Sequence, residues 1–141
     1  MLFRSGAAPR AWVTNQGSHD VTVLSLAPET PLDARATLAT VPVGRSPAGV
    51  VAVAARGEVV VSNADAPYLS VLSMDNPSEI ARIDAPPGIV GLAASADGQR
   101  LFAADWYGRQ VLVIDLPGRR TLARVPVGQA PAGLEIGRAH V

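Results

Sequence analysis

Val41-Pro42-Val43-Gly44, followed by Pro47-Ala48-Gly49, returns 84 residues later as Val125-Pro126-Val127-Gly128, followed by Pro131-Ala132-Gly133. A weaker copy lies halfway between them, at Ile83-Asp84-Ala85-Pro86 with Gly91. The sequence therefore repeats with a period of 42 residues. A fixed period of about 20–50 residues is typical of solenoids and propellers, in which successive repeats bury their apolar faces against one another.

Other segments recur in the same phase. Residues 61–63 align with residues 103–105, and residues 69–72 align with residues 111–114. An earlier copy, Trp12-Val13-Thr14-Asn15, precedes the second copy by 48 residues instead of 42. We expect the six additional residues to lie in a longer loop at residues 27–36, which is rich in Pro, Asp and Thr.

Each unit contains four short segments rich in Val, Leu, Ile and Ala, separated by turn residues. In the middle unit the predicted strands span residues 49–54, 58–63, 69–74 and 79–85. None of these segments has the length or the 3.6-residue periodicity of an amphipathic helix. Four strands in a unit of about 40 residues is typical of one blade of a β-propeller. The predicted fold class is therefore all-β, with β-propeller blades of four antiparallel strands.

Two of the predicted strands are continuous apolar runs, at residues 59–61 and 111–114. A run of this kind predicts a strand that is buried on both faces. Blades that pack face to face around an axis would provide that burial.

Trp12-Val13-Thr14-Asn15 resembles the tetrapeptide that names the YVTN-repeat β-propeller family, with Trp in the place of Tyr. The resemblance covers residues 9–134 and includes Val21-Thr22-Val23-Leu24, the repeated Val-Pro-Val-Gly and the hairpin signal Ala96-Asp97-Gly98-Gln99-Arg100. Asn63 keeps the last residue of the tetrapeptide, whereas Asp105 replaces it in the third copy. The resemblance implies a seven-bladed propeller in the periplasm or on the cell surface. Relatives of this family include lactonases of the phosphogluconolactonase type and propeller domains of some copper and haem reductases.

The repeats divide the chain into three parts. We expect residues 1–8 to be a poorly ordered lead-in, residues 9–134 to form about three blades, and residues 135–141 to be a sequencing-adapter or cloning scar. The last seven residues, Glu135-Ile136-Gly137-Arg138-Ala139-His140-Val141, match the translation of a common short-read adapter. Closed propellers have about 4–8 blades, so we expect an incomplete ring. Its open apolar faces would be covered by the remaining blades of a parent propeller or by self-association.

Composition excludes several classes of function. Basic and acidic residues balance at 12 each, which argues against a nucleic-acid partner. The chain has no Lys and no Cys, which removes Schiff-base chemistry, disulfides and Cys-based metal sites. We also predict no membrane span, because no apolar run approaches the roughly 20 residues that a spanning helix needs.

Propeller ligands usually meet loops near the central channel, and the chain offers two candidates there. The loop Trp106-Tyr107-Gly108-Arg109 departs most from the repeat, so Trp106, Tyr107 and Arg109 are predicted to bind a ligand. His19 and Asp20 are the second candidate, with one imidazole and one carboxylate. A metal site usually needs three or four ligands, so no metal site, no cofactor and no catalytic residue is predicted.

Other conspicuous residues have simpler interpretations. Asn15, Asn63 and Asp105 would either array oxygens around an axis or cap their own turns by bonding the backbone two residues on, and the second interpretation is favoured. Asp97-Gly98 is predicted to be a hairpin turn. Arg119-Arg120 is predicted to be a solvated hairpin tip.

The favoured hypothesis is a non-enzymatic propeller module that binds or scaffolds an unknown protein or small-molecule partner. One alternative is a lactonase-like hydrolase with a divalent metal at the channel mouth. Another is a structural subunit of the cell surface or the periplasm.

Overall fold

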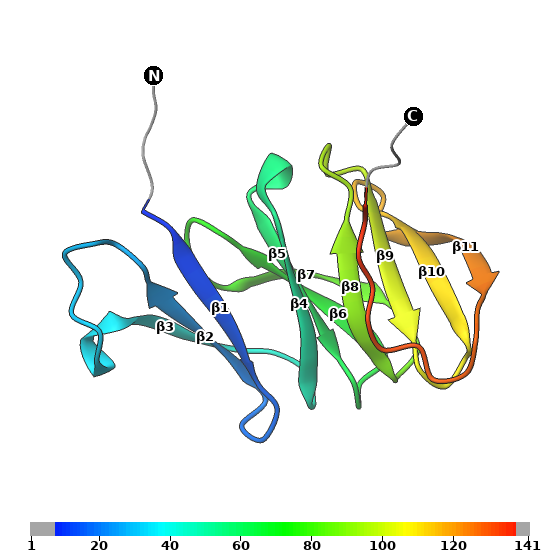
Figure 1. Ribbon diagram of the computed structural model, residues 1–141, viewed down its shortest axis with the longest axis horizontal. Helices are drawn as coiled ribbons and strands as arrows, with labels where there is room; N and C mark the ends of the chain where they lie inside the picture. Colours follow the sequence, from blue (N-terminus) through cyan, green and yellow to red (C-terminus); the bar gives the residue numbers. More distant parts are fainter. Residues whose placement is uncertain (1–7, 138–141) are drawn as a thin grey trace.

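Three antiparallel β-sheets follow one another along the chain in the computed structural model, which describes residues 8–137 (Figure 1). Sheet 1 contains β1 (Arg10–Asn15), β2 (Asp20–Ser25) and β3 (Thr37–Pro42). Sheet 2 contains β4 (Pro47–Val53), β5 (Glu58–Asn63), β6 (Tyr68–Ser73) and β7 (Glu79–Asp84). Sheet 3 contains β8 (Ile89–Ala94), β9 (Arg100–Asp105), β10 (Gln110–Asp115) and β11 (Arg120–Pro126). Within each sheet, every strand pairs with its neighbour in sequence, as in the blades of a propeller.

The predicted fold class is confirmed: the described chain is all-β and forms separate antiparallel sheets, with four strands each in sheets 2 and 3 and three in sheet 1. In sheet 2 the observed strands differ from the predicted ones by at most two residues at either end, and β5 matches exactly at residues 58–63. The long loop expected at residues 27–36 is present, and it contains a short 3-10 helix, η1 (Ala34–Ala36). Asp33 caps η1 by accepting a hydrogen bond from the Arg35 backbone N–H at 2.9 Å. A second 3-10 helix, η2 (Ala54–Arg56), connects β4 to β5.

Two apolar cores lie between the sheets. The core between sheets 1 and 2 includes Val21, Val23, Val59 and Val61. The core between sheets 2 and 3 includes the following buried residues: Val60, Leu69, Val71, Ile83, Leu101, Leu112 and Ile114. Val59, Val60 and Val61 are all fully buried, because consecutive side chains of β5 enter opposite cores. The prediction of two-sided burial is confirmed for this strand.

The same prediction is wrong for β10. Leu112 and Ile114 are fully buried, but Val111 and Val113 are only half-buried. Their side chains lie on the other face of sheet 3, and within residues 8–137 no further sheet packs on that face. The apolar run therefore marks a surface that lacks its neighbour in this structure. Sheet 1 shows a similar exposed face, with Val13 and Leu38 each at least 40% exposed.

Glycines set the close approach of successive sheets. A Cβ atom on Gly49 of β4 would lie 2.8 Å from the carbonyl oxygen of Val90, in β8. The carbonyl of Ala132 lies against Gly91 of β8 in the same way, 42 residues further on in both partners. Residues 131–137 form no strand, but they run beside β8 in Figure 1. The repeat thus continues in three dimensions to Ala132.

The connections between sheets also repeat in backbone conformation. Ser46, Gly88 and Ala130 occupy the same position of the repeat, and their φ angles are 55°, 94° and 50°. This left-handed conformation is uncommon for residues with a side chain. Only the middle connection carries Gly. Within the described part of the chain, no helix is long and apolar enough to cross a membrane.

Candidate functional site

One end of the three sheets is built from the loops that follow their second strands, together with the connections between sheets. Backbone hydrogen bonds join these loops in series. Ala64 N–H donates to Ser46 O at 2.8 Å, Gly88 N–H donates to Ala64 O at 2.8 Å, and Trp106 N–H donates to Gly88 O at 3.0 Å. Adjacent sheets therefore hold their loops in fixed positions relative to one another.

A pocket of about 400 Å³ opens among these loops. Its lining residues are Gln16, Ala64, Asp65, Gly88, Val90, Trp106 and Tyr107. Gln16, Ala64 and Trp106 each follow directly on the second strand of their repeat, in sheets 1, 2 and 3. The repeat itself thus brings one residue from each of three sheets to a common pocket.

The aromatic side chains at this pocket are open to solvent. Trp106 is 44% exposed and Tyr107 is 74% exposed. The Tyr107 ring lies on the backbone of Gly88, where an added Cβ atom would be 2.5 Å from Tyr107 Cδ2. The absence of a side chain at Gly88 therefore lets the ring lie close against the connection between sheets 2 and 3.

His19 and Asp20 do not line this pocket. His19 Nδ1 accepts a hydrogen bond from the Ser46 backbone N–H at 3.0 Å, which ties the β1–β2 loop to the connection between sheets 1 and 2. Asp20 Oδ1 accepts hydrogen bonds from Asn15 Nδ2 at 2.8 Å and from Ser18 Oγ at 2.9 Å, so it braces its own hairpin. Both side chains already have partners that fix the local fold.

Arg109 is exposed and lies outside the lining of the pocket as well. Its backbone has a left-handed φ of 52°, and its carbonyl oxygen accepts a hydrogen bond from Val127 N–H at 2.9 Å. Of the five residues for which the sequence predicts ligand binding, the structure brings Trp106 and Tyr107 together in one pocket. A binding role for any of the five stays a prediction.

The repeated Asn and Asp residues brace hairpins, as favoured from the sequence, but through other partners than those expected. Asn63 Nδ2 donates to Tyr68 O and to Ser70 Oγ, both at 3.1 Å. Asp105 accepts hydrogen bonds from Gly108 N–H and from Gln110 Nε2, both at 2.9 Å. These partners lie three to seven residues on. Asp105 caps its own turn at Gly108, and the other partners lie on the strand across the hairpin.

A serine, a histidine and a carboxylate meet at the connection between sheets 1 and 2. Ser46 Oγ donates a hydrogen bond to Asp65 Oδ2 at 2.5 Å, while His19 Nδ1 accepts from the backbone of the same serine. A nucleophilic serine needs an imidazole at its hydroxyl to take the proton. Here the hydroxyl is bonded to the carboxylate instead, so the arrangement holds loops together. Within residues 8–137, no group of three or more His, Cys, Asp and Glu is placed to hold a metal ion.

At the opposite end of the sheets, Glu58 forms a buried ion-pair cluster. Its carboxylate lies 3.0 Å from Arg56 Nε and 2.9 Å from Arg119 Nη2, and the residue is 7% exposed. Burial raises the pKa of Glu58, but hydrogen bonds from Arg119 and Arg56 outweigh this effect and leave the pKa below its ordinary value. The prediction of a solvated tip is therefore wrong for Arg119, which is paired with Glu58 of sheet 2.

Two features of the site were missed from the sequence. Gln16 was not singled out, although its alignment with Ala64 and Trp106 in the repeat could have shown that it shares their position. Glu58 was missed because the sequence does not show that Arg119, 61 residues away in another sheet, joins the nearby Arg56 at its carboxylate.

Comparisons with known proteins agree on the fold. No family model and no curated protein sequence matches this chain. Among solved structures, the hydrazine synthase of Kuenenia stuttgartiensis superposes with a TM-score of 0.76 at 20% identity, over 88% of this chain and 34% of that one. The dihydro-heme d1 dehydrogenase NirN, in complex with DHE, has a TM-score of 0.68 at 20% identity, over 91% and 27%. Apo AztD from Citrobacter koseri has a TM-score of 0.66 at 11% identity, over 91% and 35%.

These likenesses support the β-propeller fold and, at such low identity, the fold alone. This chain spans between 27% and 35% of the length of these three solved chains. Its three sheets correspond to part of a propeller, and they do not close a ring within the described residues.

Proposed function

We propose that this chain is part of a β-propeller that binds a ligand in the pocket beside Trp106 and Tyr107 and has no chemistry of its own. One observation carries the proposal. Loops from three successive sheets place Gln16, Ala64 and Trp106 at the same repeat position around a pocket of about 400 Å³. Pockets for small molecules generally measure about 300–1,000 Å³ and combine apolar walls with a few polar groups.

The lining indicates the chemistry of the ligand. Trp106 and Tyr107 offer ring surface for stacking, and Asp65 is the one charged residue in the lining. An aromatic ring attracts a cation over its face, and a carboxylate adds a direct charge interaction. The pocket therefore suits a flat or apolar group that carries a positive charge or hydrogen-bond donors.

Benzylamine is a suitable probe, with benzoate as its oppositely charged counterpart. In a Trp12→Phe variant, Trp106 is the sole tryptophan and its fluorescence reports on the pocket. We expect saturable quenching by benzylamine and at least about tenfold weaker binding of benzoate. Asp65→Asn should remove this preference, and Arg109→Ala, on the same loop but outside the pocket, should leave it unchanged. Equal affinities for the two probes, or no saturable signal, would contradict the proposal.

A hydrolase is the second candidate, because His19, Ser46 and Asp65 lie next to one another. It requires the imidazole to leave the Ser46 backbone N–H and reach the hydroxyl. Hydrolysis of the model lactone dihydrocoumarin, measured with and without Ca²⁺ or Zn²⁺, tests it directly. Saturable hydrolysis that is lost in both Ser46→Ala and His19→Ala would favour the enzyme over the binding module.

We extend the proposal to membership of the YVTN-repeat propellers, with the periplasmic or surface location that this implies. The position of Trp12-Val13-Thr14-Asn15 supports it, because the tetrapeptide lies in β1, the counterpart of the second strands β5 and β9. Partners would include other blades, which would pack on the exposed face of sheet 1 at Val13 and on the exposed face of sheet 3 at Val125. Cell fractionation of the source organism tests the location, and a cytoplasmic protein would contradict it.

A further inference from the structure

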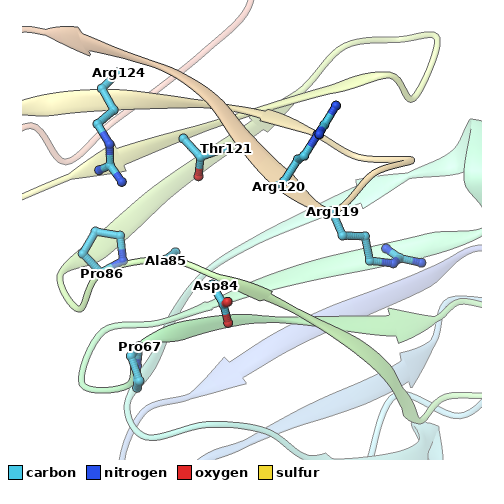
Figure 2. A pocket seen from close by; sticks show the side chains of 8 residues that line it. All are labelled: Pro67, Asp84, Ala85, Pro86, Arg119, Arg120, Thr121 and Arg124. Carbon is cyan, nitrogen blue, oxygen red and sulfur yellow. The ribbon is translucent and has the colours of Figure 1, made fainter.

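A second pocket, of about 460 Å³, lies between the outer strands of sheets 2 and 3 (Figure 2). Its lining residues are Pro67, Asp84, Ala85, Pro86, Arg119, Arg120, Thr121 and Arg124. The wall from sheet 2 is formed by the end of β7 and the prolines next to it, and the wall from sheet 3 is formed by β11 and the turn before it. We call this space the outer cleft.

The equivalent arginine of sheet 2 shows what Arg124 lacks. Arg82 of β7 occupies the same repeat position as Arg124 of β11, 42 residues earlier. Its Nε lies 2.9 Å from Glu79 Oε1, and its guanidinium lies 4.2 Å from the centre of the Tyr68 ring. In sheet 2 the arginine is therefore held by a carboxylate on its own strand and by an aromatic ring on the neighbouring strand.

Both partners are replaced in sheet 3. The residue equivalent to Glu79 is Thr121, and the residue equivalent to Tyr68 is Gln110. Among residues 8–137, no ion pair uses the guanidinium of Arg124. Sheet 3 therefore has the arginine at the same position as sheet 2, but it has the hydroxyl of Thr121 where sheet 2 has the carboxylate of Glu79.

Thr121, which stands where sheet 2 has Glu79, lines the outer cleft. Figure 2 shows the guanidinium of Arg124 reaching from β11 toward Pro86, with the Thr121 hydroxyl turned into the space between the two sheets. Arg119 extends toward Glu58, with which it is paired, and Arg120 extends away from the opposite wall. Arg124 and Thr121 are thus the donors available inside the cleft.

The geometry points to a binding site for a small carboxylate in the outer cleft. The ligand carboxylate takes the place that the Glu79 side chain fills in sheet 2, and it accepts hydrogen bonds from Arg124 and Thr121. Arginine suits this role because its planar group can donate two parallel hydrogen bonds to a carboxylate. This site lies apart from the pocket at Trp106 and does not depend on the function proposed for it.

Asp84 narrows the class of ligand further. It is exposed on the opposite wall, and its carboxylate would repel a bare anion but accept a hydrogen bond from an ammonium or hydroxyl group. The walls between these polar groups are Pro67, Ala85 and Pro86, which are uncharged. The ligand is therefore a short amino acid or hydroxy acid, with its carboxylate on sheet 3 and its donor on sheet 2.

Binding of four probes to the full chain tests this inference by NMR titration of backbone amides. Propionate supplies the carboxylate alone, ethylammonium the cation alone, β-alanine both, and lactate a carboxylate with a hydroxyl. We expect saturable shifts at Thr121 and Arg124 with β-alanine and lactate, weaker binding of propionate, and no shift there with ethylammonium. Asp84→Asn should abolish the advantage of β-alanine over propionate.

Two variants and a matched control locate the carboxylate. Arg124→Gln should weaken binding at least about tenfold, because it removes a charged hydrogen-bond donor. Thr121→Glu restores the carboxylate that sheet 2 has at Glu79, so it should block the site and raise thermal stability. This variant adds a group to the cleft, whereas Arg124→Gln removes one. Arg82→Gln, the same change at the arginine that already has partners, should alter affinity less than about twofold.

Three results would overturn the inference. The first is the absence of saturable shifts with any of the carboxylates at probe concentrations up to about 50 mM, since a single charged site of this kind should bind with millimolar affinity. The second is equal weakening by Arg124→Gln and Arg82→Gln. The third is undiminished binding in Thr121→Glu.

Discussion

The guanidinium of Arg119, in the turn between β10 and β11, lies 2.9 Å from the carboxylate of Glu58 at the start of β5. The two residues belong to sheets 3 and 2 and are 61 positions apart in the sequence. Arg56 holds the other oxygen of the same carboxylate at 3.0 Å. Glu58 is thus the polar link between these sheets at the end opposite the Trp106 pocket.

Replacement of Glu58 should loosen this link. We expect Glu58→Gln to lower the free energy of unfolding by about 1–3 kcal/mol, because two arginines lose the charge of a largely buried partner. Urea denaturation followed by circular dichroism measures the change. Asp33→Asn is the control, since the Asp33–Arg35 pair is exposed and should contribute little to the free energy of unfolding. An equal effect of both substitutions would contradict this role for Glu58.

The same carboxylate predicts a pH dependence of stability. Because the pKa of Glu58 is lower in the folded chain than its ordinary value of 4.5, the folded state favours the charged form. The resulting stabilisation is present above about pH 4.5 and is lost as the pH falls through the lower, folded-state pKa. Wild type and Glu58→Gln should therefore differ in stability at pH 7 and converge at acidic pH. A difference that persists unchanged to pH 3 would argue against the charge as its source.

Gly88 should resist substitution for two reasons. Its φ of 94° disfavours any residue with a side chain, and a Cβ atom would lie 2.5 Å from the Tyr107 ring. We expect Gly88→Ala to cost about 1–3 kcal/mol and to change the environment of Tyr107, as seen by near-UV circular dichroism. Gly17→Ala is the matched control, because no atom lies within 4 Å of the added Cβ. Equal effects of both variants on stability would show that the contact between Gly88 and Tyr107 does not stabilise the fold.

The core between sheets 2 and 3 can be distinguished from the open surface of sheet 3 by truncation. Ile114→Ala removes a fully buried side chain and should cost about 2–5 kcal/mol. Leu122→Ala, at a residue that is 45% exposed, should cost less than about 1 kcal/mol. Chemical denaturation of the two variants checks the ratio, and similar costs would place the core elsewhere.

The exposed face of sheet 1 should promote self-association of this chain. Val13 is 41% exposed there, in the middle of a strand, and Leu38 is 50% exposed. We expect Val13→Arg to reduce the mass measured by light scattering after size-exclusion chromatography. Leu32→Arg is the control, because Leu32 lies in the loop between β2 and β3 and not on the face of the sheet. An unchanged mass in Val13→Arg would exclude this face from the contact.

The fold could be predicted from the sequence because the repeat fixes it several times over. The Val-Pro-Val-Gly copies give the period, the glycines and prolines give the turns, and continuous apolar strands such as β5 show that sheets pack on both sides. The prediction failed at β10, where the same apolar pattern is half-exposed. A continuous apolar run indicates that both faces of a strand can be buried, whereas the observed burial also depends on which neighbouring sheets are present.

The candidate sites were harder to predict because they depend on contacts between repeats. Trp106 and Tyr107 were singled out because they break the repeat on an exposed loop, and their binding role stays a prediction. His19 was also singled out, but its imidazole is used as an acceptor for Ser46, which no local pattern shows. The outer cleft was missed altogether. Its signal is the loss of the Glu79 carboxylate at Thr121, which becomes meaningful once Arg82 is seen to be paired and Arg124 is not.

The left-handed residues Ser46 and Gly88 lie in the connections between successive sheets, and Ala130 occupies the same repeat position after sheet 3. We call these three positions the joints. Since the backbone has the same left-handed conformation at every joint, each sheet that follows a joint starts in an equivalent direction relative to the sheet before it. Cutting the gene at two such joints and removing the 42 codons between them would leave a shorter array whose ends still meet in register. Length changes in this protein should therefore be tolerated in whole repeats at the joints, and far less readily as small insertions within a strand.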